Sequence, residues 1–283
     1  MIKRGDRIEG NPYLIEDNSS VRLTRIPLNE KEFQEDWIQK FIHERPEIIP
    51  VNELEPNFSP IIPIGKEVKT AVGYIDNLYI SPDGYLTIVE TKLWRNPEAR
   101  REVVGQIIDY AKVLNKWSFS DLDDSVKIYN QQYNNSNIGV IEAIQEKADI
   151  EENQIAKLID RISRNLKRGR FLLLIVGDGI QENVEEMIEY LSQTPQILFT
   201  LALIELQVYK FKEKQNSMLV IPQILTRTTE ITRAVIQFEG NQQNNINVIV
   251  PAVSIITKSK PLSFASFIAS FAILTGFLLS SSE

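Results

Sequence analysis

The chain has 283 residues, of which 43% are hydrophobic and 24% charged, and this predicts a globular protein with one large domain or two small ones. It contains no cysteine and one histidine, which excludes disulfides, thiolate zinc sites and cysteine nucleophiles, argues against a histidine-dependent triad and fits a reducing cytoplasm. The net charge of −7 argues against a nucleic-acid binder whose affinity depends on positive charge over its whole surface.

Residues 1–30 are predicted to form a polar arm with one possible strand. A helix is predicted over 29–42, because apolar residues recur there at helical spacing and a proline follows shortly after. Two adjacent acids, Glu35 and Asp36, lie near its start, where a negative charge is favourable for the helix dipole. The only histidine, His43, is expected to be a packing or surface residue.

A β-hairpin is predicted around the turn Ser81–Gly84. Its sequence has proline where a type I turn needs φ of about −65° and glycine where φ becomes positive. If the loop has a bulge at this glycine, the serine pairs with Tyr85. The same register sets Asp76 opposite Glu90, with Cβ atoms about 4.5 to 5.5 Å apart. A shift of one residue would separate the two acids.

The predicted pair of Asp76 and Glu90 needs compensation for its like charges. Opposed like charges destabilise a sheet by up to about 1 kcal/mol, and by more when they are partly buried. Lys92 lies on the same strand face as Glu90 and supplies one positive charge, and a divalent ion bound by oxygen ligands would supply two more. Mg²⁺ is expected because it keeps several waters, and binding lowers the pKa of such a water toward that of a nucleophile.

A helix carrying Gln106 and Tyr110 is predicted to follow the hairpin. The spacing of four residues places both side chains on one helix face, although Tyr110 is alternatively a core aromatic. Arg95 lies before this helix, and Arg100 and Arg101 lie near its start. We predict that these arginines contact nucleic-acid phosphates, since a guanidinium group can bind a phosphate bidentately.

Four segments of this region form a recognisable set. They are Gly73-x-Ile75-Asp76, Pro82-Asp83-Gly84, Ile88-Val89-Glu90-Thr91-Lys92-Leu93 and Arg100-Arg101-x-Val103-x-Gly105-Gln106-x-x-x-Tyr110. Together they resemble the PD-(D/E)XK nuclease superfamily, most closely its branch with an added Gln-x-x-x-Tyr motif. The resemblance covers about residues 31–238. It implies an α/β (α+β) fold with a restriction-endonuclease-like αβββαβ core and a mixed central sheet.

The resemblance also implies roles for the residues of the hairpin. Asp76 and Glu90 would bind the metal, with help from the backbone carbonyl of Thr91, and Lys92 would orient the attacking water and stabilise developing charge. The first acid follows an isoleucine here rather than a proline, which is a frequent variation in the superfamily. A literal Pro-Asp occurs at the hairpin tip, but Asp83 lies up to about 23 Å from the second acid, and we interpret it as a turn residue.

Three further residues are assigned to the same site by the resemblance. Gln106 and Tyr110 would face it from the helix after the hairpin. The first helix of the superfamily carries an acid that reaches the metal through water. Glu35 is the position that we match to this acid, and the adjacent Asp36 competes for the assignment.

A helical insertion is predicted over about 119–170. Its segment from Lys157 to Arg170 has cations on one side and apolar residues on the other, as in a basic amphipathic helix. The cations either form a solvated face that balances the acidic segment Glu142–Glu152 or follow phosphates beside the site. The predicted nucleic-acid contacts of this helix are Arg161, Arg164, Lys167 and Arg168.

The remaining elements are predicted to complete one continuous mixed sheet. A buried strand is expected over 171–176, a helix over 181–193, and strands near 198–211 and 218–238. Asp178 follows the first of these strands and is interpreted as a turn residue. The nuclease-like domain would then span 31–240. Residues 241–283 would form a linker and an apolar helix whose pattern favours a docked helix, or the start of a further domain, over a membrane anchor.

The sequence therefore predicts a cytoplasmic, Mg²⁺- or Mn²⁺-dependent nuclease, acting on nucleic acid and preferably on DNA as an endonuclease. A homodimer is compatible with this prediction, and no base-reading element is identified. Two alternatives stay open. One is an inactive nucleic-acid or protein interaction module in which Asp76, Glu90 and Lys92 form a structural cluster. The other is a carboxylate-pair glycosidase, which leaves the lysine without an evident role.

Overall fold

A computed structural model describes residues 11–17, 19–26, 34–93, 99–178, 198–211 and 217–228, without the side chains of 99–101. The chain divides into two units, Met1–Arg233 and Ala234–Glu283. The second unit lies outside the described residues, and so do the predicted helices over 181–193 and 262–279. Within the described part, no helix has the length and apolar character needed to cross a membrane.

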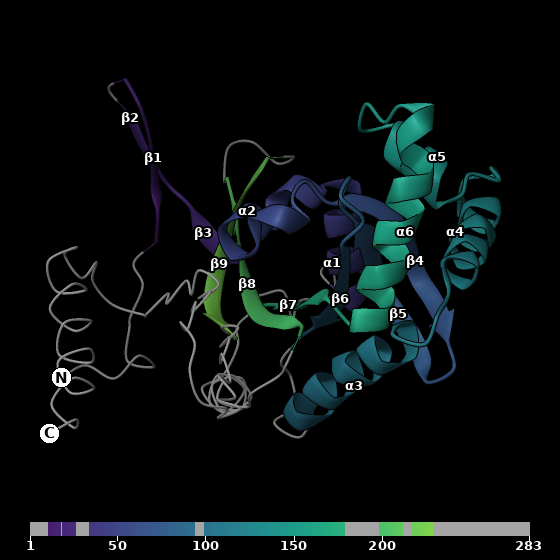
Figure 1. The fold of residues 1–283 in the computed structure, drawn as a ribbon. Coiled ribbons are helices and arrows are strands. Elements are labelled where there is room, and N and C mark those ends of the chain that lie inside the picture. The colour runs from purple at the N-terminus through teal and green to yellow at the C-terminus, as the bar shows by residue number, and fades with distance from the viewer. Residues whose placement is uncertain are drawn as a thin grey trace, which may run out of the picture. The chain divides into compact units, whose positions relative to one another are not determined.

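The first unit is a mixed α/β fold built around a central sheet (Figure 1). Its strands are β1 (Tyr13–Glu16), β2 (Ser19–Arg22), β3 (Thr24–Ile26), β4 (Ile62–Thr70), β5 (Gly73–Ile80), β6 (Leu86–Lys92), β7 (Phe171–Gly177), β8 (Thr200–Lys210) and β9 (Met218–Arg227). Its α-helices are α1 (Glu35–Glu44), α2 (Val51–Leu54), α3 (Ala99–Leu114), α4 (Phe119–Tyr133), α5 (Val140–Gln145) and α6 (Glu152–Arg168). Two 3₁₀ turns, Pro46–Ile48 and Pro56–Phe58, flank α2.

Among the described residues, seven strands form one sheet in the order β3-β8-β7-β6-β5-β4, and β9 pairs with β8. The pairs β6–β7 and β7–β8 are parallel, and the other pairs of this sheet are antiparallel. This confirms the prediction of a mixed-direction central sheet. Every residue of β7 is buried, as expected for a strand between parallel neighbours with both faces covered.

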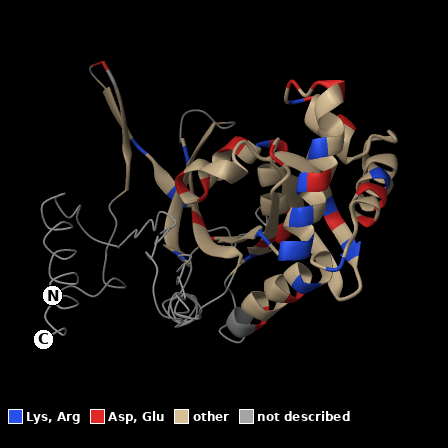
Figure 2. Cartoon of the chain, viewed as in Figure 1, with Lys and Arg blue, Asp and Glu red and all other residues tan. Residues whose placement is uncertain are grey.

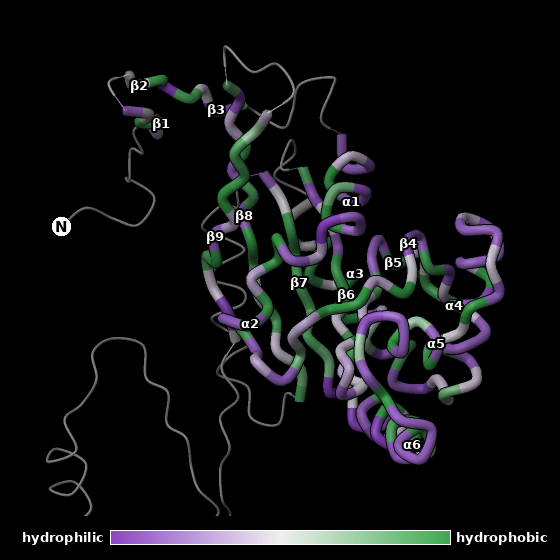
Figure 3. Tube along the Cα trace, turned by 90° about the horizontal axis from the view of Figure 1, so that it is seen from above, coloured by the Kyte–Doolittle hydropathy of each residue, from purple (hydrophilic) through white to green (hydrophobic). Residues whose placement is uncertain are grey.

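Helices cover both faces of the sheet. Side chains of α3, α4, α5 and α6 form one apolar cluster with one face, and α1, α2 and the residues around them form a second cluster with the other. Figure 3 shows the hydrophobic character of the strands between these layers. In α6 the buried residues Leu158, Ile162 and Leu166 recur every four positions, which confirms the predicted amphipathic helix.

The N-terminal segment differs from the predicted arm. Its described residues, 11–17 and 19–26, contain three short strands rather than one, and β3 pairs with the C-terminal end of β8 through Thr24↔Lys210 and Ile26↔Val208. Ile26 is buried in the apolar cluster on the α1 side of the sheet. Residues 24–26 therefore belong to the main sheet. Burial of Ile26 stabilises their contact with it by removing apolar surface from water.

The hairpin of β5 and β6 has the predicted turn and register. The N–H of Gly84 donates to the Ser81 carbonyl over 2.9 Å, and the N–H of Ser81 donates to the Tyr85 carbonyl over 2.9 Å. Gly84 has φ of 78°, the left-handed conformation that glycine adopts without strain. The strands pair from Ile80↔Leu86 to Asn77↔Val89, the register that was predicted.

We predict that Gly84→Ala destabilises the protein by about 1 to 3 kcal/mol. A Cβ atom there would have a positive φ and would lie 2.7 Å from Cγ1 of Ile162 on α6. Gly105→Ala on α3 is the matched control, since its Cβ would have no neighbour within 4 Å and alanine favours a helix. Urea unfolding should show loss of stability in the first variant and a gain of up to about 1 kcal/mol in the second; equal behaviour of the two would contradict the expected packing of α6 on the turn.

Candidate active site

The candidate site lies where the pairing of β5 and β6 ends. The last recorded pair is Asn77↔Val89, and the same register continued by one residue would set Asp76 opposite Glu90. Beyond that pair, the backbone N–H and the hydroxyl of Thr91 both donate to Oδ2 of Asp76, each over 2.7 Å. The Asp76 carboxylate therefore accepts from a backbone group of β6 at the point where the recorded ladder stops.

Glu90 is the most deeply buried acid of the site, with 3% of its surface exposed. Its Oε2 atom has no hydrogen-bond partner among the described residues. Burial raises the pKa of Glu90 to about 9, and the negative charge of Asp76 contributes next, while Lys92 opposes the rise. Burial also raises the pKa of Asp76 to about 6, against the lowering effect of the hydrogen bonds from Thr91. Two carboxyl groups thus share a poorly solvated region.

A third acid, Glu67 on β4, was not predicted. The pairs Lys66↔Asn77 and Val68↔Ile75 flank it, so its position lies across from Asp76. Its negative charge contributes to the raised pKa of Asp76 and of Glu90. Glu67 has φ of 53°, a left-handed value that is uncommon for a residue other than glycine.

Helix α1 brings Glu35 to the end of β6. Its Oε1 atom accepts a hydrogen bond from the backbone N–H of Leu93 over 3.1 Å and lies 3.6 Å from Nζ of Lys92. Asp36 is exposed on the same helix. Glu35 and Asp36 were the two candidates for the acid of the first helix. Glu35 is the one that lies beside Lys92.

A polar network fixes α1 against the sheet. Nδ2 of Asn77 donates to the Gln39 carbonyl over 3.1 Å and lies 3.4 Å from Nδ1 of His43, whose Nε2 lies 2.7 Å from the hydroxyl of Tyr129. The Asn77 donor assigns the imidazole proton to Nε2. Burial, and after it the positive charge of Lys66, lower the pKa of His43 to about 4. The histidine is thus a neutral packing residue that helps to hold the helix carrying Glu35.

Tyr110 is a core aromatic, which was the alternative interpretation, and its role in the site stays a prediction. It is 1% exposed within the apolar cluster on the α3 side, and its hydroxyl accepts a hydrogen bond from Nε2 of Gln106 over 2.8 Å. Burial raises the pKa of Tyr110, and the charges of Glu90, Asp76 and Glu67 add to this effect. The ring is therefore part of the core, and its hydroxyl lies within electrostatic range of the acids.

Of the predicted phosphate-binding cations, those described on α6 are not brought together with the acids. Arg161 Nη1 lies 3.4 Å from Oδ1 of Asp83, at the hairpin tip, while the acids lie at the other end of β6. The exposed cations Arg164, Lys167 and Arg168 follow on the same helix, and Figure 2 shows the positive charge along α6. This corrects the expectation that the basic helix lies beside the site, since about 23 Å of strand separates them. Arg95 lies outside the described residues, and the side chains of Arg100 and Arg101 are not described.

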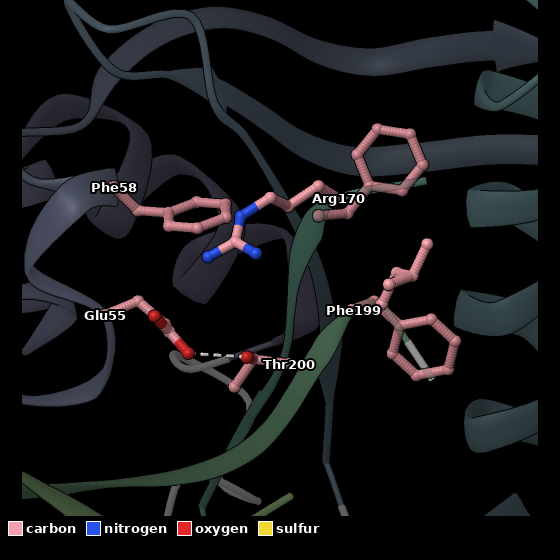
Figure 4. A pocket seen from close by; sticks show the side chains of 7 residues that line it. Glu55, Phe58, Arg170, Phe199 and Thr200 are labelled. Carbon is pink, nitrogen blue, oxygen red and sulfur yellow. Dashed lines mark hydrogen bonds between the residues drawn. The ribbon is translucent and has the colours of Figure 1, made fainter. Parts of the chain in front are cut away.

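The described residues contain no group of three or more acidic or histidine side chains placed to hold a metal ion. Asp76 and Glu90 remain as a pair of oxygen donors. A cavity elsewhere, lined by Glu55, Phe58, Arg170 and Thr200 among others, lies near the first residues of β7 and β8 (Figure 4). Its volume of about 10 Å³ admits no more than one water, so it offers no competing ligand site.

Comparison of the chain with protein-family models and with curated proteins finds no match.

The raised pKa values of Asp76 and Glu90 predict a pH dependence of stability. The folded protein holds protons that the unfolded chain releases near pH 4, so the free energy of unfolding falls as the pH rises through folded pKa values of about 6 and about 9. We expect Glu90→Gln to reduce this fall and to stabilise the metal-free protein at pH 9 by about 1 to 3 kcal/mol.

Urea unfolding at pH 5 and pH 9 measures this effect in the wild type and the variant. The exposed Glu146→Gln is the control and should keep the wild-type pH dependence. If the free energy of unfolding of Glu90→Gln fell between pH 5 and pH 9 as much as that of the wild type, the buried Glu90 carboxyl would not be the source of the pH dependence.

Proposed function

We propose that this protein is a metal-dependent nuclease that hydrolyses phosphodiester bonds of nucleic acid, with DNA as the favoured substrate. The observation that carries the proposal is the buried Glu90 carboxyl, one oxygen of which has no partner among the described residues, one position beyond the last recorded β5–β6 pair, where the same register would set it opposite Asp76. A buried acid pair without enough hydrogen-bond donors is the environment that a cation would complete. Lys92 and Glu35 lie beside it.

The order of elements supports a restriction-endonuclease-like core. Helix α1 is followed by the antiparallel strands β4, β5 and β6, then by α3 and, after the helical insertion, by β7 parallel to β6. This is the αβββαβ order that the resemblance implies. The acids lie at the carboxyl end of β6, and in open α/β sheets ligands bind at the carboxyl ends of strands.

The donor set fits a hydrated Mg²⁺ or Mn²⁺ ion. Asp76 and Glu90 would bind it, and Mg²⁺ is usually held by one or two protein carboxylates together with substrate phosphates. The Thr91 carbonyl is a further donor, because the N–H and C=O of one strand residue point the same way and this N–H points to Asp76. When bound, the ion would lower the pKa of a coordinated water and offset charge on the phosphodiester.

Lys92 is the residue that we assign to the attacking water. Its ammonium group lies 3.6 Å from Oε1 of Glu35, and it opposes the raised pKa of Glu90. The amine thus lies close to both acids, and it can donate a hydrogen bond to a water or a phosphate oxygen. Glu35 also accepts from the Leu93 backbone, which keeps its carboxylate at the end of β6.

An exposed aromatic residue supports nucleic acid as the substrate class. Tyr74 is 52% exposed and lies two residues before Asp76 on β5. Aromatic side chains in such positions stack on unpaired bases. The cations of α6 are too distant for the reacting phosphate and would contact the backbone of a longer substrate.

A second candidate function is a binding module that does not cut. It is favoured by the pairing already present in the metal-free protein, in which Thr91 satisfies Asp76 and Glu35 pairs with Lys92. With a pKa of about 9, Glu90 is neutral at pH 7 and adds no charge to the cluster. The two functions differ in whether the protein turns over its substrate.

We expect cleavage of plasmid, single-stranded DNA or RNA in Mg²⁺ or Mn²⁺, with a loss of about 100-fold or more in Asp76→Ala and Lys92→Ala. Asp83→Asn is the control within the same hairpin, because this acid is 62% exposed at the tip and should be dispensable. Gel assays under single-turnover conditions measure the rates. Equal rates in the wild type and both site variants on every substrate would remove the nuclease assignment.

Tyr74→Ala should weaken binding of single-stranded DNA by about 1 to 3 kcal/mol, the usual contribution of one stacked base. Tyr13→Ala on β1 is the control, since this tyrosine is similarly exposed, at 58%, outside the main sheet. Fluorescence anisotropy in Ca²⁺, in which cleavage is not expected, gives both affinities. If the two variants bind equally well, Tyr74 is not a stacking residue.

A further inference from the structure

Glu67 is an acid whose backbone conformation has no explanation in the sheet itself. It lies inside β4, between two regular pairs with β5, yet its φ of 53° falls in the left-handed region. Glycine or asparagine adopts this conformation with less strain than glutamate. Strained residues of this kind persist where the surrounding structure holds them, and they gather at functional sites.

The position of Glu67 adds a third acidic residue to the pair. The flanking pairs set its position on β4 across from Asp76 on β5, and the β5–β6 register continued by one residue sets Asp76 across from Glu90, so neighbouring positions on β4, β5 and β6 carry acids. No described cation forms an ion pair with Glu67. Glu90 is 3% exposed, and among the described residues its Oε2 atom has no hydrogen-bond partner, so a cation held there would meet an acceptor that the described protein groups do not use.

We propose that Glu67 is a positioning residue of the candidate site, which holds a hydrated divalent cation through the water shell of that ion. The inference rests on the proposed function, because it concerns the same cation. It adds to the site a residue of β4, which the sequence motif of β5 and β6 does not include. The strained backbone is the local cost of directing an acid toward this site.

The proposed contact of Glu67 with the ion runs through water rather than by direct coordination. The described acids do not form a group of three that could ligate one ion directly, whereas two carboxylates and several waters are sufficient for Mg²⁺. An outer carboxylate accepts hydrogen bonds from those waters. Removing such a group commonly lowers metal affinity by about 10- to 100-fold.

Two substitutions separate charge from strain. Glu67→Gly removes both, so the metal-free protein should gain about 2 to 4 °C in Tm while its Mn²⁺ affinity falls about 10-fold or more. Glu67→Gln removes the charge and keeps the backbone constraint, so its Mn²⁺ affinity should fall similarly with a smaller gain in Tm. A residue with only a structural role would change Tm and leave Mn²⁺ affinity as it was.

Isothermal titration calorimetry with Mn²⁺ and thermal unfolding of metal-free protein test the proposal, with Glu146→Gln as the control. Weaker Mn²⁺ binding in both Glu67 variants, together with retained or raised Tm, would support it. If the wild type binds Mn²⁺ and Glu67→Gln binds it equally well, the role of Glu67 is refuted and the proposed function stands. If the wild type binds neither Mn²⁺ nor Mg²⁺, the proposed function fails and this inference fails with it.

Discussion

The repulsion between acidic side chains at the end of the β5–β6 ladder is the constraint on which the site depends. Ionised carboxylates are costly to remove from water, and a buried one commonly takes up a proton instead. The fold limits this cost with two donors from Thr91 to Asp76 and with a lysine close to Glu90. It leaves one oxygen of Glu90 unpartnered among the described groups.

The neighbouring strands and helices hold the acidic residues in place at the end of the β5–β6 ladder. Strand β6 is covered on both faces by apolar clusters, so it cannot shift without exposing core residues. The hairpin turn sets the register between β5 and β6, and α6 packs on the turn through Ile162. The turn lies at one end of the hairpin and the acids at the other. Because the turn sets the strand register, it also determines which residues of β5 and β6 lie opposite each other near the acids.

Local chemistry was sufficient to predict much of this arrangement. The turn Ser81–Gly84 has residues with strong conformational preferences, and counting outward from it gave the register that the strands keep from Ile80↔Leu86 to Asn77↔Val89. The unbroken apolar run of β7 likewise predicted a buried strand. Helix α1 was predicted by its apolar spacing, and the choice of Glu35 over Asp36 agrees with the contact to Lys92.

Other features depend on tertiary contacts that the sequence does not show. The turn between β4 and β5 has Ala71 and Val72 at its centre, without the Asn-Gly signal of a tight hairpin, and Thr70 closes it through side-chain hydrogen bonds. The position of Glu67 therefore could not be counted from a turn. The charge pattern of α6 predicted the helix, but the end of the sheet that it packs on depends on tertiary contacts, such as that of Ile162 with the turn at Gly84.

The neutral state of the single histidine has a practical consequence. With a pKa near 4, His43 stays uncharged throughout the range in which the carboxyl groups of Asp76 and Glu90 change ionisation. The pH can therefore be varied over the range in which Asp76 and Glu90 titrate without protonating His43, whose contacts with Asn77 and Tyr129 help to hold α1. An optical or nuclear magnetic resonance titration above pH 5 would report the carboxyl cluster free of any imidazole signal.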